Sequence, residues 1–158
     1  MAKTKICRVP SSLGSVTNAT AETTLGSVVC KANSIKYDHK VRIQAIAKTP
    51  STNSTDTFAL RLKLGSTTLA TVTAFDAADN DVCFITFEGF LNANGELLHG
   101  IAFDGRTGQA LANPEPVADQ AFNTDADNTF SVTGQWSVAS ANNNAVLKHF
   151  VLELEPVD

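Results

Sequence analysis

The three histidines are the first side chains to consider for metal chemistry. His39, His99 and His149 stand far apart in the chain, and no HxH or HxxxH spacing occurs. A zinc or cupin-type site needs two imidazoles close together on a strand and a third ligand to complete the shell. We therefore expect no metal site and no cofactor, and we interpret each histidine as a satisfied residue of the fold or of an interface.

Two acidic turns contain the oxygen ligands that calcium prefers. The segment DAADND runs from Asp76 to Asp81, and DADN runs from Asp125 to Asn128. Neither segment has the spacing, the glycine and the bidentate glutamate of an EF-hand loop. We interpret both as ordinary turns between strands, with a calcium site as the alternative for the first.

Nucleophilic catalysis has no clear candidate in the sequence. Cys7, Cys30 and Cys83 are widely separated and lie in or beside apolar runs, which is typical of buried free thiols, although a reactive thiol or a metal site is the alternative. No GxSxG elbow is present, and the segment GSVTNAT from Gly14 lacks the lysine of a P-loop. We predict a binding protein that is not an enzyme.

Composition limits the classes of partner. The chain has 158 residues, enough for one domain with a hydrophobic core, and its charged content of 18% is below the usual quarter. The net charge of -4 gives no reason to expect binding to a phosphate backbone. No segment reaches membrane-spanning length, and the basic start MAKTKICR is not followed by the apolar stretch of a signal peptide. We expect a soluble protein made in a cytosol, with no membrane partner and no direct nucleic-acid partner.

The elements that must position any site are strands. TFALRLKL alternates apolar and polar residues, and the turn Gly65–Ser66 leads into TTLATVT, which predicts a hairpin. VCFITFEGFL is apolar on both faces, as in a central strand, and the polar stretch 109–128 is predicted to be a long loop with room for a short edge strand. About eight strands without βα alternation predict an all-β fold, an antiparallel jelly-roll β-sandwich, with an immunoglobulin-like sandwich as the alternative.

The last two strands contain many apolar side chains that must be buried. Phe130, Val132 and Trp136 form one row, so we expect Trp136 to be buried. In the final strand Val146, Phe150, Leu152 and Leu154 are expected on one side, while Leu147 and Val151 leave the other side partly apolar. A strand that is apolar on both sides needs more cover than one sandwich provides.

The second half of the chain resembles a known class of viral proteins. FALRLKLGSTTLATVTAFDAADNDVCFITFEGFL, followed by NTFSVTGQWSVASANNNAVLKHFVLEL, resembles the jelly-roll structural proteins of tailed bacteriophages, especially capsid cement or decoration proteins. The resemblance covers about two thirds of the chain, from Phe58 onward, and consists of strands and turns without a catalytic signature. It implies a virion protein on the outer capsid surface, made in the host cytoplasm, that clamps neighbouring copies of the major capsid protein.

The same resemblance implies a homotrimer. Trimerisation would cover the second apolar face, so we expect Leu147, His149 and Val151 at the trimer interface. Residues 1–24 are predicted to form an N-terminal arm, with Lys3, Lys5 and Arg8 as the contacts to the capsid or to a neighbouring subunit, and residues 25–158 to form the jelly-roll domain. The alternative function is a receptor- or glycan-binding head of a phage tail or head fibre.

Overall fold

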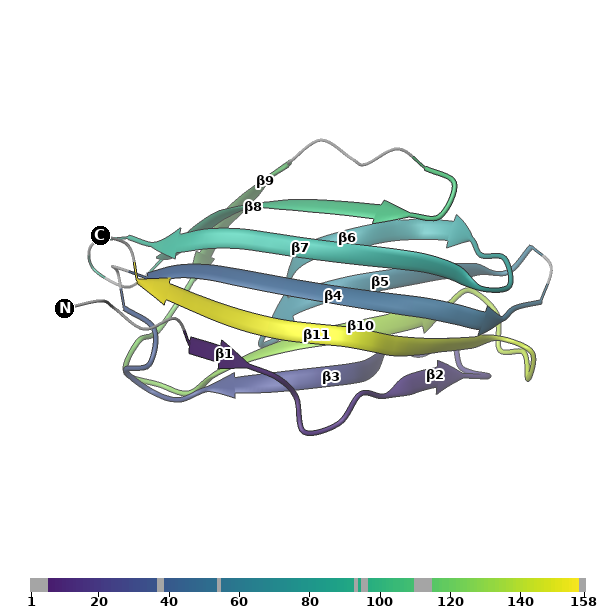
Figure 1. The fold of residues 1–158 in the computed structure, drawn as a ribbon, viewed down its shortest axis with the longest axis horizontal. Helices are drawn as coiled ribbons and strands as arrows, with labels where there is room; N and C mark the ends of the chain where they lie inside the picture. Colours follow the sequence, from purple (N-terminus) through teal and green to yellow (C-terminus); the bar gives the residue numbers. More distant parts are fainter. Residues whose placement is uncertain are drawn as a thin grey trace.

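The computed structural model describes residues 6–36, 39–53, 55–92, 94, 97–109 and 115–156, and every regular element among them is a β-strand. The larger sheet has the order β1-β11-β4-β7-β8-β9, with β2 also pairing with β11, and the smaller sheet has the order β3-β10-β5-β6 (Figure 1). All strand pairs are antiparallel. The strands are β1 (Ile6–Arg8), β2 (Ser15–Thr17), β3 (Thr23–Cys30), β4 (His39–Ser51), β5 (Thr57–Leu64), β6 (Thr67–Asp76), β7 (Asp81–Leu91), β8 (Leu97–Arg106), β9 (Glu115–Ala121), β10 (Asn128–Trp136) and β11 (Asn144–Pro156).

The predicted all-β sandwich is confirmed, with eleven strands in place of about eight. The order β11-β4-β7 stands beside β3-β10-β5-β6, and the chain crosses between the sheets from β3 to β4, β4 to β5, β6 to β7, β9 to β10 and β10 to β11. This is the connectivity of a jelly roll. Three strands exceed the predicted number. β1 and β2, of three residues each, both lie along β11, and β9 extends the larger sheet beyond β8. The long loop predicted over 109–128 contains the edge strand β9.

Local sequence explains the best-predicted elements. Gly65 has φ 57°, a backbone conformation that suits glycine, and it closes the predicted β5–β6 hairpin. The apolar strand β7 is central, because β4 and β8 pair with its two edges. β8 continues through Arg106, and the chain turns at Thr107 and Gly108.

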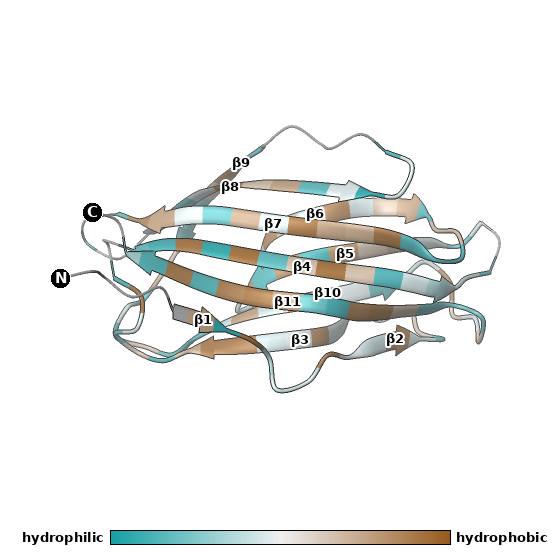
Figure 2. Ribbon diagram, viewed as in Figure 1, coloured by the Kyte–Doolittle hydropathy of each residue, from teal (hydrophilic) through white to brown (hydrophobic). Residues whose placement is uncertain are grey.

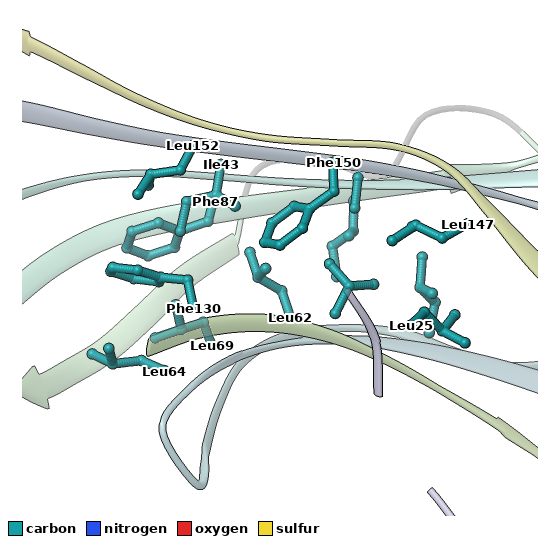
Figure 3. Packing of buried hydrophobic residues seen from close by; sticks show 14 of the residues in the cluster. Leu25, Ile43, Leu62, Leu64, Leu69, Phe87, Phe130, Leu147, Phe150 and Leu152 are labelled. Carbon is teal, nitrogen blue, oxygen red and sulfur yellow. The ribbon is translucent and has the colours of Figure 1, made fainter. Parts of the chain in front are cut away.

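The core lies between the two sheets, as Figure 3 shows for Phe87, Phe150 and Leu152 above and Leu62, Leu64 and Phe130 below. Trp136 is 1% exposed, and its ring centroid lies 5.0 Å from that of Phe58. The Trp136 Nε1 atom donates a hydrogen bond to the Val16 carbonyl at 3.3 Å. The expected burial of Trp136 is therefore confirmed. Val138 follows the end of β10 and is 46% exposed.

A bulge in β11 changes the faces predicted for the last strand. Leu147 pairs with Ala47 and His149 pairs with Ile46, so one extra residue of β11 stands between the two pairs. This shift places both Leu147 and Phe150 in the core. The prediction that Leu147 lies on the second apolar face is wrong, whereas Val151 does lie on the opposite side from Phe150 and Leu152.

The first strands pack onto the sandwich. β1 pairs with residues Leu152–Leu154 of β11, and β2 pairs with residues Asn144–Val146. Val16 is 2% exposed and belongs to the core. The part of the predicted arm that the structure describes therefore contributes to the larger sheet, while Lys3 and Lys5 lie outside the described residues.

One buried asparagine joins loops at the end of the sandwich where β5 begins. Asn143 is fully buried, and its Nδ2 atom donates hydrogen bonds to Asp56 Oδ2 at 2.8 Å and to the Val138 carbonyl at 3.0 Å. Its Oδ1 atom accepts a hydrogen bond from the Asn53 amide at 2.8 Å, and its carbonyl accepts one from the Asn18 amide. The Asn143 side chain thus joins the β4–β5 loop to the β10–β11 loop, and its backbone carbonyl adds a bond to the segment after β2.

Candidate functional site

The larger sheet presents a wide surface that no described residue covers. We call its side pointing away from the smaller sheet the outer face. Alternation and register place these residues on it: Lys40, Arg42, Gln44, Ile46 and Lys48 of β4, Val82, Phe84, Thr86, Glu88 and Phe90 of β7, His99, Ile101 and Phe103 of β8, and His149, Val151 and Glu153 of β11. In Figure 2, polar and apolar bands alternate along β4, β7 and β11, because inner and outer residues alternate.

Apolar side chains are unusually frequent on the outer face. Ile46 is 37% exposed, Phe90 45% and Ile101 42%, and they come from three adjacent strands. Val151 also lies on this face, beside Gln44 in register, but it is only 9% exposed. In register, Ile46 lies opposite Phe84, whereas Phe90 and Ile101 lie further along the sheet beside Glu88. Several exposed apolar residues on one face of a folded domain are typical of an interaction surface.

An ion-pair cluster crosses the same face. Lys40 Nζ lies 2.9 Å from Glu88 Oε2, and Arg42 Nε lies 3.0 Å from Glu88 Oε1. All three side chains are partly exposed, so the pairs contribute little to stability. Their effect is to set fixed charges among the apolar groups, which favours a partner with matching charges.

The predicted interface residues divide between two environments. His149 is exposed and Val151 lies beside it on the outer face, next to Ile46 and Gln44 in register. Leu147 is 1% exposed and packs toward Gly26 of β3, so it is not available to a partner. The neighbouring residue Ile46, which lies opposite His149, was not singled out from the sequence. The alternation of inner and outer residues along β4 would have placed Ile46 on the outer face.

Arg8 differs from the other two predicted arm residues because the structure describes it within β1. It pairs with Leu152, and its charge lies close enough to the Cys30 thiol to lower the pKa of that thiol slightly against the larger effect of burial. The Nε atom of Arg8 is buried and has no hydrogen-bond partner among the described atoms. Arg8 therefore lies against the body of the sandwich.

A groove opens where the edges of the two sheets meet. It has a volume of about 280 Å³ and lies between β6 of the smaller sheet and β8 and β9 of the larger sheet. We call it the β6–β9 groove; its lining includes Thr68, Thr71, Ala102, Asp104, Glu115 and Gln120. β6 and β9 are the last strands of their sheets, so each has one edge without a described partner strand.

Asp104 brings a carboxylate to the inner face of β8. It pairs in register with Ile85, which is fully buried, and therefore points toward the smaller sheet. Burial raises the pKa of Asp104, and the positive charge of Arg106 offsets part of this rise. Arg106 itself lies over the Phe75 ring at 4.8 Å and donates from Nε to Gln109 Oε1 at 2.6 Å. Asp104 was not singled out from the sequence, because its position opposite Ile85 depends on the pairing of β8 with β7.

The histidines are held by different parts of the fold. His99 Nδ1 lies 2.6 Å from Asp119 Oδ1, and His39 Nδ1 accepts a hydrogen bond from the Lys36 amide at 3.0 Å. His149 is exposed on β11. Within the described ranges no three His, Cys, Asp or Glu side chains are grouped so that they could hold a metal ion. Asp79 of the first acidic turn accepts a hydrogen bond from the Thr52 amide at 2.8 Å, and Asp127 of the second accepts one from the Ala32 amide at 3.0 Å.

The three cysteines are free, but only two are buried. The prediction for Cys7 is wrong, because β1 lies at the sheet edge and leaves this thiol exposed, with its Sγ atom 3.8 Å from Glu153 Oε1. Burial raises the pKa of Cys30 from 9.0 to about 11 and that of Cys83 to about 12.

These thiols give a direct test of burial in solution. At pH 8 we expect Ellman's reagent to label one thiol per chain, Cys7, because the thiolate is the reactive form and Cys30 and Cys83 stay protonated and covered. All three should react in guanidinium chloride. Because the two folded pKa values are raised, the folded state gains stability from these thiols below pH 9, and that gain is lost as the pH rises toward 12. Labelling of Cys83 in the native protein as fast as Cys7 would contradict the described core.

No protein-family model matches the sequence, and no curated protein matches it. Also, no described helix is long and apolar enough to span a membrane.

Several solved structures are similar in fold. The insecticidal delta-endotoxin Cry8Ea1 from Bacillus thuringiensis aligns with 91% of this chain at 17% identity and a TM-score of 0.42, and the chain spans 19% of that protein. The alginate lyase of family PL-14 from Aplysia kurodai aligns with 96% of the chain and 82% of its own length, at 10% identity and a TM-score of 0.38. A structure of infectious bursal disease virus, Gx strain, aligns with 99% of the chain and 42% of its own, at 9% identity and a TM-score of 0.37. These similarities concern the fold alone, and no function follows from them.

Proposed function

We propose that the chain is a non-enzymatic structural protein of a virion, a capsid cement or decoration protein that assembles as a homotrimer and binds the major capsid protein on the outer capsid surface. The observation that carries the proposal is the outer face, where Ile46, Phe90 and Ile101 remain exposed over three adjacent strands. The resemblance of the sequence from Phe58 onward to phage jelly-roll proteins supports the same role. Such a role needs surface contacts between protein copies and no chemistry.

The proposed trimer contact is centred on β11. His149 and Val151 lie on its outer face next to Ile46 of β4, and only the ends of β11 are paired with β1 and β2. A neighbouring copy placed here would cover the exposed Ile46 side chain and the middle of an incompletely paired strand. Closed cyclic symmetry would repeat this contact until no such edge is left exposed.

Capsid binding would then be multivalent. A trimer presents each capsid-contacting group three times, so contacts that are individually weak give strong binding to a repeating lattice. The basic residues Lys3 and Lys5 are proposed to contact the capsid or a neighbouring copy. Removing residues 1–24 would not test this contact alone, because it would also remove β1, β2 and the buried Val16.

Light scattering tests the assembly. We expect a particle of about 50 kDa at micromolar concentration, three times the chain mass of 16.7 kDa. Ile46→Glu should raise the dissociation constant of the trimer at least tenfold, on the order of 1.4 kcal/mol, because a charge would be buried at the apolar contact. Val29→Glu is the matched control, since Val29 is 41% exposed on the smaller sheet. A monomer for the unsubstituted chain would refute the trimer.

Copy number separates the proposed function from its alternative. A decoration protein should copurify with virions in hundreds of copies, whereas a receptor- or glycan-binding head of a fibre should be present in only a few. Strong and selective signals on a glycan array, together with a low copy number, would favour the fibre head.

A further inference from the structure

The β6–β9 groove carries negative charge that no described cation neutralises by an ion pair. Asp104 and Glu115 both line it, and Glu115 pairs in register with Ala102, which places it on the same side of the sheet as Asp104. Neither carboxylate forms an ion pair within the part of the chain that the structure describes. The nearest cation, Arg106, is held against Phe75 and Gln109.

The groove also offers a free backbone edge. β6 pairs with β5 on one side and with no described strand on the other, and Thr68–Thr71 of β6 form one wall of the groove. The sequence from Thr67 to Phe75 contains no charged residue and no proline, so this edge lacks the usual protection against strand addition. An unprotected edge beside a side-chain pocket is the arrangement by which sheets bind extended segments.

We propose that the β6–β9 groove binds the basic segment Lys3–Lys5 of a neighbouring copy of this chain. This inference rests on the proposed assembly of identical copies and names one of its contacts. Lys3 and Lys5 stand two positions apart, so both would point to the same side of an extended segment, about 7 Å from each other, toward Asp104 and Glu115.

The fold places the two halves of this contact at opposite edges of one molecule. β1 borders β11 at one edge of the larger sheet, and β9 forms the other edge, as Figure 1 shows. Five residues precede β1, and an extended chain of that length reaches about 17 Å. A contact that joins one edge of a copy to the opposite edge of the next is heterologous, and such contacts form a closed ring, such as a trimer, when the rotation between copies closes.

Charges along the chain favour this occupant. Four of the ten described lysines and arginines form ion pairs within their own copy: Lys31 with Asp127, Lys40 and Arg42 with Glu88, and Lys63 with Glu22. The first eight residues hold three of the twelve basic residues, and two of these, Lys3 and Lys5, precede the first strand. The carboxylate groove and the basic segment therefore complement each other in charge.

Peptide binding tests the groove independently of assembly. The receptor is the full chain with Lys3→Glu and Lys5→Glu, and the probe is a peptide of residues 1–8 under reducing conditions. We expect the amide NMR signals of Thr68–Thr71 and of Val117–Gln120 to shift on titration. Asp104→Asn combined with Glu115→Gln should weaken binding at least tenfold, whereas Asp125→Asn, an exposed carboxylate elsewhere, should leave it unchanged.

Two peptide controls define the specificity. A peptide with glutamate at both lysine positions should not bind, and one with its two lysines moved to adjacent positions should bind at least fivefold more weakly. Equal binding of the rearranged peptide, shifts that avoid β6 and β9, or a saccharide that binds the groove while the peptide does not, would each overturn the proposal.

Assembly gives the second test. Glu115→Lys, or Lys3→Glu with Lys5→Glu, should each raise the dissociation constant of the trimer at least tenfold, and their combination in one chain should restore it to within threefold. A trimer that is unaffected by any of these variants would overturn the groove contact and leave the proposed assembly intact. If the unsubstituted chain is a monomer but still binds the peptide in the groove, the proposed trimer is refuted and peptide binding by the groove is supported.

Discussion

Replacing Phe58 with alanine is expected to lower the free energy of unfolding by about 3–5 kcal/mol, the range for loss of a buried aromatic side chain. Phe58 is fully buried in β5. Its ring lies 5.0 Å from the Trp136 ring and 6.3 Å from the Phe75 ring, the latter in an edge-to-face arrangement at 84°. The substitution would remove both contacts and leave a cavity between β5, β6 and β10, which the sheets on either side cannot close.

Urea unfolding measures this loss, because Trp136 is the single tryptophan and lies against the altered position. Circular dichroism should report the same midpoint if unfolding is two-state. The control is Phe58→Leu, which keeps much of the volume and should cost less than about 1.5 kcal/mol. A loss below about 1 kcal/mol for Phe58→Ala would show that the aromatic cluster is not packed as described.

Gly100→Ala is expected to destabilise the protein by about 3 kcal/mol, at the upper end of the range for overpacking. Gly100 pairs with Gly89 across β7 and β8, and the Phe87 ring lies over both glycines. A Cβ atom on Gly100 would lie 2.5 Å from the Phe87 ring and 2.6 Å from the Glu88 carbonyl oxygen. The ring could move, but the carbonyl belongs to the backbone of a central strand.

The matched control is Gly26→Ala, where the shortest contact of an added Cβ would be 2.9 Å to Cδ2 of Leu147, the tip of a flexible side chain. We expect a cost of about 1 kcal/mol there. Thermal unfolding of both variants gives the comparison. Adding Phe87→Leu to Gly100→Ala should recover part of the loss, since it removes one clash and leaves the other. Equal stability of Gly100→Ala and the unsubstituted protein would rule out the described β7–β8 register.

Several parts of the fold could be predicted because their signals are local. The β5–β6 hairpin combines alternating residues with a glycine turn, and the apolar strand β7 occupies the centre of its sheet. β1 and β2 could not be found in this way, because three residues are too few to show a period of two. They form because β11 offers an edge for them to pair with.

The candidate site was predictable only in part, for related reasons. Alternation along β11 correctly separated Val151 from Phe150 and Leu152, but the bulge before His149 moved Leu147 into the core. A bulge depends on the partner strand and has no sequence signature here. The β6–β9 groove joins strands that are separated by about forty residues in the sequence, so its carboxylates become neighbours of β6 only in the folded chain.

The buried Asn143 amide has a consequence for using this protein as a carrier of foreign peptides. It ties the loops around Asn53 and Val138 together, so an insertion in either would break hydrogen bonds that the other loop shares. The tip of the β5–β6 hairpin lies at the far end of β5, where Gly65 and Ser66 are exposed and a Cβ on Gly65 would meet no atom within 4 Å. A peptide displayed there would project from the sandwich without loosening it.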